Sequence, residues 1–575
     1  MQKRNIAIVC LIAVAGIVAV FPATKEQSPG GTPAGVTEQV QMRDGVRLST
    51  NIFHPAGTGR FPAILIRTPY GKGTALAPNY QAFVERGYVV AMQDVRGRYA
   101  SEGIFSPLTQ EGPDGDDTLN WMAAQPWSDG KIGMTGGSYL GIVQWKVALL
   151  NNPHLKAIFP VVSGWDDYRD RFYSPGGAMK LGHRLLWMAE NTQHPNFVPD
   201  FKKFMWRLPV RFADVAATGQ ESRVYRESMD HPAYDDYWKR LSTREHIKDI
   251  RIPVFAVGGW YDNYAESDLA AFKELHKQGG TNRVLIGPWP HNMSIPFRNV
   301  SFGAQASVPI RRFQLQWFDH WLKGLDTPLL SQPPVQIFVM GANVWREEHE
   351  WPPARTRRLR YYLASNGHAN SIYGDGSLGT SPQARALPDQ FTYDPLKPVP
   401  TMGGAVCCDP AIFPWGPMDQ RPVEKRRDVL VYTSAGLTED LEVTGEVQVV
   451  LRAASDAPDT DFTAKLVDVF PNGEARNLTD GILRARYRES LEKPALMKSG
   501  EVYRLVIDAG VTSNLFRKGH RIRIEISSSN FPRFDRNLNT GKAVEDETEV
   551  RRANQVVYHD GSRRSYVSLP VIPRS

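Results

Sequence analysis

The sequence predicts an α/β domain with a mostly parallel sheet, followed by a domain built of antiparallel strands alone. Over residues 36–330, short continuous apolar runs alternate with helical patterns, as in strands that are buried on both faces of a sheet. Between residues 166 and 249 the strand pattern stops and large aromatic residues become frequent. Beyond residue 331 nearly every periodic stretch has a period of two.

The α/β part is expected to begin with an antiparallel hairpin over residues 36–53. The apolar runs and helical patterns that follow predict strands at 63–66, 88–92, 132–135, 155–162, 253–257 and 283–286, and helices at 80–86, 114–124 and 139–150. Strands that alternate with helices form a mostly parallel sheet with helices on both faces. We therefore assign residues 36–165 and 250–330 to one α/β domain.

Residues 166–249 interrupt this domain with a helical, aromatic-rich insertion. We interpret it as a helical cap over the mouth of a site, and a satellite subdomain with its own core is the alternative. Residues 331–575 open with two prolines, Pro333 and Pro334, and then alternate apolar with polar residues. This pattern predicts an all-β sandwich, and we expect a jelly roll.

The first 23 residues read as a secretory signal peptide, because Lys3 and Arg4 precede an apolar run that ends in small residues. An uncleaved membrane anchor is the alternative, although the run is short for a spanning helix. We therefore expect a secreted or periplasmic protein with no membrane segment after cleavage of the signal.

The composition excludes several classes of protein. The net charge is +7, but 68 Lys and Arg are interspersed with 61 Asp and Glu, so no nucleic-acid partner is expected. Outside the leader only Cys407 and Cys408 remain, which excludes a disulfide framework and leaves a disulfide between them and two free thiols both open. No phosphate loop or zinc motif is present, so no cofactor and no metal are expected. The sequence does not decide whether the chain forms a homo-oligomer.

The most informative stretch runs from Lys131 to Gly141. An apolar strand turns through Gly136 and Gly137 onto Ser138, and a helical pattern starts at Tyr139. A sharp strand-to-helix turn on small residues exposes the hydroxyl of the turn residue and aims backbone N–H groups at the same space. This is the geometry of a nucleophile elbow, and a Ser that merely caps a helix is the alternative.

A serine nucleophile needs a histidine base and a carboxylate that orients the histidine. Asp262 follows the strand at 253–257, and His291 follows the strand at 283–286. The chain order Ser, Asp, His is the order expected for an α/β-hydrolase sheet. We predict Ser138, Asp262 and His291 as a catalytic triad. A lone Asp or His in a loop is more often structural, so the prediction depends on the combination.

The oxyanion of the tetrahedral intermediate needs hydrogen-bond donors. The backbone N–H of Tyr139, directly after the nucleophile, is one candidate. The second donor should come from the loop after an early strand, where Tyr70 carries a phenol. A packed loop aromatic is the alternative for Tyr70.

The sequence resembles the cocaine esterase and X-Pro dipeptidyl-peptidase family of serine hydrolases, which also contains α-amino-acid ester hydrolases and glutaryl acylases. The motifs that carry the resemblance span nearly the whole mature chain: Arg67-Thr68-Pro69-Tyr70, Gln93–Arg98 with Ser101-Glu102-Gly103, Gly136–Gly141, Gly259–Asp262, Gly287–His291 and Ser527–Phe534. The resemblance implies the same triad, Tyr70 as an oxyanion donor, a cap from the insertion, and a jelly roll that closes one wall of the pocket.

The resemblance also suggests substrate-binding residues. It places Trp187 and Tyr264 in an acyl pocket, together with Phe172 at the position of a pocket Trp. The amino-acid ester hydrolases carry acidic residues shortly after the triad Asp, where this chain has Tyr264 and Ala265. This difference argues against α-amino acyl groups, because their ammonium would lack a charge partner.

We therefore expect a serine hydrolase that cleaves a small-molecule ester or amide through an acyl-enzyme. An X-Pro dipeptidyl-peptidase is the first alternative. Asp166, Asp167 and Glu266 are the candidates in this sequence for holding a free N-terminus. A catalytically inactive protein that binds surfaces through its jelly roll is the second alternative.

Overall fold

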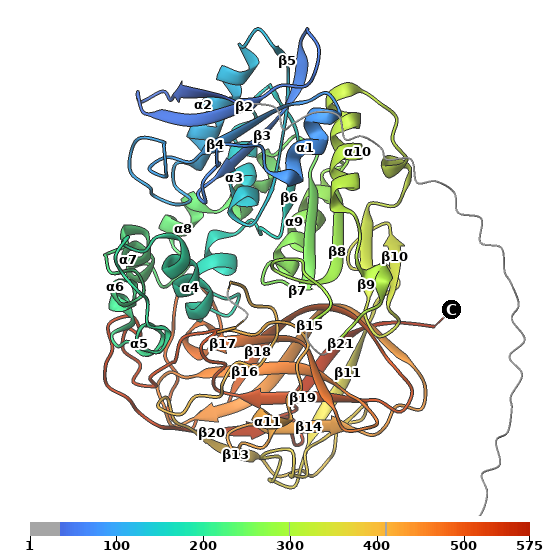
Figure 1. Cartoon of the computed structure of the whole chain (residues 1–575). Helices are drawn as coiled ribbons and strands as arrows, with labels where there is room; N and C mark the ends of the chain where they lie inside the picture. The colour runs from blue at the N-terminus through green and yellow to red at the C-terminus, as the bar shows by residue number, and fades with distance from the viewer. Residues whose placement is uncertain (1–34, 298–299, 409–410, 575) are drawn as a thin grey trace, which may run out of the picture.

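The computed structural model describes residues 35–297, 300–408 and 411–574. The predicted signal peptide lies outside these residues. The molecule has three parts: an α/β domain at the top of Figure 1, a helical cap at its side, and a β domain below both. Within the described residues no helix is long and apolar enough to cross a membrane.

The α/β domain is built on a ten-stranded sheet with the strand order β1-β2-β4-β3-β5-β6-β7-β8-β9-β10. Strands β3 to β9 pair in parallel, whereas β1, β2 and β10 join the edges antiparallel. The strand bounds are β1 Val36–Gln41, β2 Arg47–Phe53, β3 Phe61–Thr68, β4 Val89–Asp94, β5 Ser128–Gly137, β6 Leu155–Val161, β7 Phe255–Tyr261, β8 Arg283–Pro290, β9 Val335–Val339 and β10 Val344–Glu348. The predicted parallel sheet is confirmed.

Helices cover both faces of this sheet because alternate residues of each buried strand point to opposite sides. In β3, Ile64 and Ile66 belong to one core with α1 and α10, whereas Ala63 and Leu65 belong to the opposite core with α2 and α3. The helix bounds are α1 Pro78–Glu85, α2 Glu111–Ala123, α3 Tyr139–Ala148, α9 Ala265–Lys277 and α10 Ile310–Lys323. Continuous apolar runs in the strands are therefore explained by burial on both faces.

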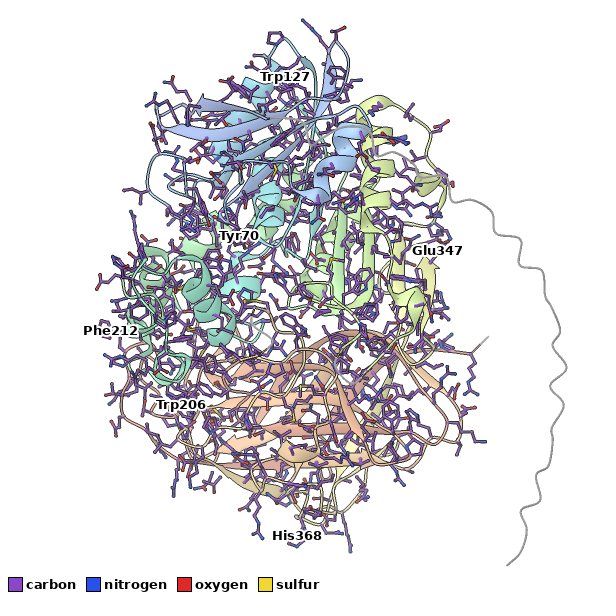
Figure 2. The ribbon with its side chains drawn as sticks, viewed as in Figure 1. Tyr70, Trp127, Trp206, Phe212, Glu347 and His368 are labelled. Carbon is purple, nitrogen blue, oxygen red and sulfur yellow. A yellow bond between two sulfur atoms is a disulfide. The ribbon has the colours of Figure 1, made fainter. Side chains whose placement is uncertain are left out.

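The cap is the insertion between β6 and β7, and its helices lie beside the carboxyl ends of the strands (Figure 1). Its helix bounds are α4 Leu181–Asn191, α5 Phe201–Trp206, α6 Ala213–Thr218, α7 Arg223–Asp230 and α8 Asp236–Leu241. The cap also contacts the β domain: Trp206, at the lower edge of the cap in Figure 2, packs edge-on against Phe531 with the ring centroids 4.7 Å apart. The cap is therefore held between the other two parts.

In its described residues the β domain contains eleven strands and one short α-helix, α11 Arg421–Glu424, which confirms the prediction of an all-β domain. Ten strands follow the order β13-β20-β15-β21-β11-β12-β14-β19-β16-β17, and β18 pairs with β15. The strand bounds are β11 Arg357–Ala364, β12 Ser377–Gly379, β13 Asp389–Tyr393, β14 Leu430–Ser434, β15 Leu441–Ser455, β16 Asp461–Val469, β17 Ala475–Arg484, β18 Tyr503–Phe516, β19 Arg521–Ser527, β20 Ala553–Tyr558 and β21 Tyr566–Ile572. The jelly-roll topology stays a prediction.

The first sheet continues past residue 331, where the sequence suggested the domain boundary. Strand β9 pairs in parallel with β8, and β10 returns antiparallel to β9. The end of β9 also contacts the β domain, since the Met340 amide donates to the Ser513 carbonyl at 2.9 Å. Strands β9 and β10 thus belong to the α/β sheet by pairing and connect it to the second domain.

Candidate active site

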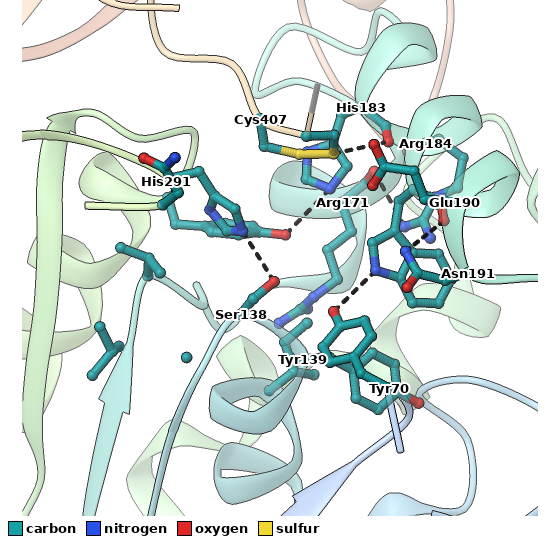
Figure 3. A pocket seen from close by; sticks show the side chains of 18 of the residues that line it. Tyr70, Ser138, Tyr139, Arg171, His183, Arg184, Glu190, Asn191, His291 and Cys407 are labelled. Atoms are coloured by element: carbon teal, nitrogen blue, oxygen red, sulfur yellow. Dashed lines mark hydrogen bonds between the residues drawn. A yellow bond between two sulfur atoms is a disulfide. The ribbon is translucent and has the colours of Figure 1, made fainter. Parts of the chain in front are cut away.

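Ser138 lies at the sharp turn between β5 and α3. Its backbone has φ 56° and ψ −123°, a strained conformation for a residue with a Cβ. The Ser138 amide donates to the Val161 carbonyl at 2.9 Å, which anchors the turn to the neighbouring strand β6. The turn therefore has the shape of a nucleophile elbow, with the hydroxyl directed out of the sheet edge (Figure 3).

The two glycines that flank the turn are required by close packing. Gly136 has φ +141°, and a Cβ built on it would lie 2.5 Å from the Cβ of Leu140. A Cβ on Gly141 would lie 2.5 Å from the Cβ of Ser163, on the loop after β6. The small residues of the motif thus allow the helix start to approach the neighbouring loop.

The structure brings the three predicted triad residues together. His291 Nε2 lies 3.0 Å from Ser138 Oγ (Figure 3). On the other side of the ring, His291 Nδ1 lies 2.7 Å from Asp262 Oδ1. Asp262 Oδ2 also accepts from the backbone N–H of Tyr264 at 3.3 Å, which fixes the carboxylate plane. The imidazole is therefore oriented by a carboxylate on one side and can take a proton from the serine on the other.

The triad forms because two adjacent strands end at the same height. β7 continues to Tyr261 and β8 to Pro290, both beyond the ends that the sequence suggested, so Asp262 and His291 each follow directly on a strand. These strands pair in parallel, with Tyr261 opposite Pro290 in the register. Parallel strands present their carboxyl ends at one sheet edge, which places both side chains beside Ser138.

Two donors face the space next to Ser138. The backbone N–H of Tyr139 begins helix α3, and the hydroxyl of Tyr70 lies in the same cavity. Desolvation raises the pKa of the Tyr70 phenol, against hydrogen bonds from Trp187, Ser138 and the Tyr139 amide that lower it. The phenol therefore keeps its proton and can donate it to an oxyanion.

The side chain of Tyr139 is anchored behind the site. Its hydroxyl donates to Glu111 Oε1 at 2.6 Å, and Arg67 Nη1 donates to Glu111 Oε2 at 2.9 Å. All three side chains are buried. Burial raises the pKa of the Tyr139 phenol well above its usual value, so its proton stays in the hydrogen bond to Glu111. This anchor fixes the residue whose amide faces the reacting carbon.

The site opens into a cavity of about 450 Å³ that all three parts of the molecule line. The α/β domain supplies the floor, the cap supplies one wall, and Cys407 and Cys408 of the C-terminal part supply another (Figure 3). The lining residues outside the triad and its donors include Pro107, Leu108, Ile142, Val161, Val162, Arg171, His183, Arg184, Trp187, Glu190, Asn191, Tyr264, Asn292 and Met293. The volume fits a small organic substrate.

Two of the three predicted pocket residues line the catalytic cavity, and the third does not. Trp187 and Tyr264 line the cavity, and the Tyr264 ring packs edge-on against His291 at 5.7 Å between ring centroids. Phe172 does not line this cavity but a neighbouring one that shares Arg184 and Trp187 with it, so a substrate-binding role for Phe172 stays a prediction. It is buried in the cap against Trp238, and the Arg184 guanidinium covers its ring at 3.8 Å.

Four residues of helix α4 that the sequence analysis did not single out also line the cavity. They are His183, Arg184, Glu190 and Asn191, which stand four and three residues before Trp187 and three and four residues after it. Residues at these spacings share one face of a helix. Once Trp187 was assigned to the pocket, the helical period alone could have identified all four.

The carboxylates considered for binding a free N-terminus have other contacts. Asp166 pairs with Arg169 and caps the residues that follow it, and Asp167 pairs with Lys146 and Arg171. Neither lines the catalytic cavity. Glu266 lines a separate small cavity between the domains, where its carboxyl faces Asp508. Glu190 is instead the carboxylate that lines the catalytic cavity.

Cys407 and Cys408 form a disulfide in the structure, one of the two states that the sequence left open. The Cys408 sulfur lies 3.9 Å from the carbonyl oxygen of His183, so the disulfide packs against the start of helix α4. Within the described residues no group of three or more His, Cys, Asp or Glu is arranged to hold a metal ion.

The fold and the site together define a serine hydrolase with an α/β catalytic domain. Residues 44–293 match the family model of the X-Pro dipeptidyl-peptidase, S15 family, and residues 330–568 match that of the X-Pro dipeptidyl-peptidase C-terminal non-catalytic domain. The chain is 38% identical to the cocaine esterase of Rhodococcus sp. (strain MB1 Bresler), over 93% of this chain and 98% of the esterase. The chain belongs to the cocaine esterase and X-Pro dipeptidyl-peptidase family of serine hydrolases.

Two solved structures share the whole architecture. An α-amino acid ester hydrolase superposes with a TM-score of 0.81 at 25% identity, covering 96% of this chain and 100% of that one. An aminopeptidase from the marine sediment archaeon Thaumarchaeota archaeon superposes with a TM-score of 0.82 at 25% identity, covering 96% and 99%. The fold is thus common to relatives that differ in their named substrates.

Proposed function

We propose that this chain is an esterase that acts on small esters with uncharged acyl groups. The observation that carries the proposal is the hydrogen-bonded line from Ser138 through His291 to Asp262, with the Tyr139 amide and the Tyr70 phenol on the same cavity. Similarity to a cocaine esterase over nearly the full length supports the ester substrate class.

The geometry gives each group one role in the reaction. His291 takes the proton of Ser138 as the hydroxyl oxygen attacks the ester carbonyl, and Asp262 stabilises the imidazolium. The Tyr139 amide and the Tyr70 phenol donate to the oxyanion. His291 then protonates the leaving alcohol, and a water molecule, activated by the same imidazole, hydrolyses the acyl-enzyme.

The walls of the cavity support an uncharged acyl group. Leu108, Ile142 and Trp187 provide apolar contacts beside Ser138. Tyr264 lies two positions after the triad Asp262 and is buried there, so no carboxylate stands at this place to hold an α-ammonium group. Apolar surface without that charge partner favours acyl groups such as aromatic or branched carboxylates.

Substrates with a free α-amino group are the second candidate class. The observation that favours them is Glu190, whose carboxylate belongs to the cavity wall near the end of helix α4. Both structural neighbours named above act, by their titles, on amino-terminal or α-amino substrates. Glu190→Gln separates the classes, since it should impair only substrates whose ammonium binds that carboxylate.

Two measurements test the proposal. A fluorophosphonate probe should label Ser138 in the folded protein and leave Ser138→Ala unlabelled, and absence of an adduct on wild-type protein would support the inactive, surface-binding alternative. Turnover of p-nitrophenyl esters should then exceed turnover of Ala-Pro-p-nitroanilide. Faster cleavage of the anilide would replace the esterase assignment with a dipeptidyl-peptidase.

We further propose that the mature protein is exported, because the first 23 residues have the composition of a signal peptide. The Cys407–Cys408 disulfide supports an oxidising compartment, where such bonds persist. Fractionation of expressing cells with N-terminal sequencing tests this proposal. A soluble product that starts near residue 24 is expected, and a membrane-bound product that keeps residues 1–23 would indicate the anchor.

A further inference from the structure

The indole of Trp187 is hydrogen-bonded to the phenol of Tyr70. Trp187 Nε1 donates to the Tyr70 hydroxyl oxygen at 3.1 Å, across the border between the cap and the α/β domain (Figure 3). Trp187 comes from helix α4, whereas Tyr70 comes from the loop after β3. The bond therefore links the cap directly to a group that we assign to the oxyanion site.

The same indole also contacts the other oxyanion donor. The rings of Trp187 and Tyr139 stack with their centroids 5.9 Å apart and an angle of 8° between their planes. Tyr139 is itself held by its hydrogen bond to Glu111. Trp187 thus stacks on an anchored ring while its N–H is directed at Tyr70.

The chemistry of the two side chains determines which of them donates the hydrogen bond. An indole N–H is a donor only, whereas a phenol has one O–H donor and an oxygen that accepts. Because the Trp187 N–H occupies the oxygen as acceptor, the phenol proton of Tyr70 must point elsewhere. Tyr70 and Ser138 line the same cavity, so the phenol proton can point at a substrate oxygen bound beside Ser138.

We propose that Trp187 is a positioning residue that orients the Tyr70 phenol for oxyanion stabilisation, beyond its place in the pocket wall. The inference rests on the proposed function, since it needs an oxyanion to be formed at Ser138. Accepting a hydrogen bond also polarises the phenol and makes its O–H a better donor. The cap therefore supplies part of the machinery of the transition state through a residue that does not itself touch the oxyanion.

A double-mutant cycle tests the proposal. Trp187→Phe keeps an aromatic ring to stack on Tyr139 and removes only the N–H. We expect kcat for a p-nitrophenyl ester to fall about tenfold with KM within about twofold, because the bond acts in the transition state. In a Tyr70→Phe background the same change should have no further effect on kcat, since the acceptor is already absent.

Two controls separate positioning from packing. Trp206→Phe changes a cap tryptophan that is 42% exposed and does not line the cavity, and kcat should be unchanged. If Trp187→Phe lowers the melting temperature, benzothienylalanine at position 187 replaces the N–H by sulfur in a bicycle of the same shape, and it should give the same loss in kcat.

The outcomes distinguish this inference from the proposed function. An active wild-type enzyme whose kcat is unchanged by both substitutions at 187, or falls equally with and without Tyr70, would refute the positioning role. A change in KM alone would leave Trp187 as a pocket wall only and would also refute it. A wild-type protein that neither reacts with the fluorophosphonate nor turns over esters would refute the hydrolase function itself.

Discussion

Asp262 and His291 follow directly on two neighbouring parallel strands, and Oδ1 of the one lies 2.7 Å from Nδ1 of the other. Their contact is set by the register of β7 and β8, in which Tyr261 lies opposite Pro290. The dyad is thus a property of the sheet, and only the serine is placed by a strained turn.

Asp262→Asn should lower kcat by about 10⁴ without unfolding the protein, because the amide stabilises the wrong tautomer of His291 and no longer balances its charge. Asp268→Asn is the matched control. Burial raises the pKa of the Asp268 carboxyl well above its usual range, which favours the protonated form that an amide resembles. Steady-state kinetics of both variants check the prediction, and an equal loss in the two would contradict it.

Tyr70→Phe should lower kcat by about 10², with KM little changed, because one of two oxyanion donors is lost. Desolvation holds the pKa of this phenol above its ordinary value of 10.0. The Tyr70 phenol therefore stays protonated up to at least pH 10, and its titration should not limit the activity in that range. A kcat equal to that of wild type in Tyr70→Phe would remove the residue from the mechanism.

Reduction of the Cys407–Cys408 disulfide should raise KM about 3- to 10-fold and leave the triad intact. Opening the bond frees two side chains that form one wall of the cavity, so packing against the substrate is lost. The double variant Cys407→Ser, Cys408→Ser should show the raised KM without a reductant and should not respond to one. The prediction fails if fully reduced wild-type protein, verified by thiol titration, keeps its KM.

Gly141→Ala should destabilise the protein by about 1–3 kcal/mol, because the new methyl group would lie 2.5 Å from the Cβ of Ser163 in a packed interior. Gly137→Ala is the comparison, since the nearest atom to its Cβ would be the Val161 carbonyl oxygen at 3.6 Å, an ordinary contact. Urea unfolding of both variants measures the difference. Equal free energies of unfolding would contradict the prediction and show that the loop after β6 can move to accommodate the methyl group.

Glu424 should make the protein less stable as the pH rises. Burial and the nearby Glu525 raise the pKa of the Glu424 carboxyl from 4.5 to about 7, although Arg523 Nη1 donates to it at 2.7 Å. The folded state then binds a proton that the unfolded state has lost, so the free energy of unfolding falls between those two pH values. Glu424→Gln should flatten this part of the profile in urea titrations, and identical slopes would contradict the assignment.

The sequence was sufficient for the sheet and the triad because both depend on local signals. Apolar runs such as Ala63–Ile66 must be buried on two faces, and the residues directly after such runs lie at the carboxyl edge of a parallel sheet. The triad of Ser138, Asp262 and His291 could therefore be predicted from the order of these residues in the chain and from the apolar strands that precede them. The exact strand ends mattered less than their common direction.

Phe172 was placed by resemblance alone, and its surroundings depend on a local backbone feature that the resemblance does not reveal. It ends a π-helical segment, Asp167–Phe172, in which the Tyr173 amide bonds to the Tyr168 carbonyl at 2.7 Å. A π-turn contains one more residue than an α-helical turn, so it changes the direction in which its side chains point. The ring of Phe172 consequently enters the cap core beside Trp238.

The sheet to which strand β9 belongs and the burial of the polar side chains of β19 could not be predicted for a different reason. Strand β9 looks like any other apolar strand, and only its distant partner β8 assigns it to the first sheet. In β19 the polar residues Arg523 and Glu525 read as a solvent face, but both are buried and paired, with Glu424 and Lys465. Neutralisation by partners far along the chain is invisible to a period-two pattern.

The sulfur-lined wall at Cys407 and Cys408 has a consequence for protein engineering. Because the catalytic domain forms the nucleophile and the C-terminal part contributes this wall, a chimera that exchanges residues after 400 among family members would transplant selectivity along with the graft. In such hybrids the catalytic residues would come from one family member, whereas both members would contribute to substrate selectivity.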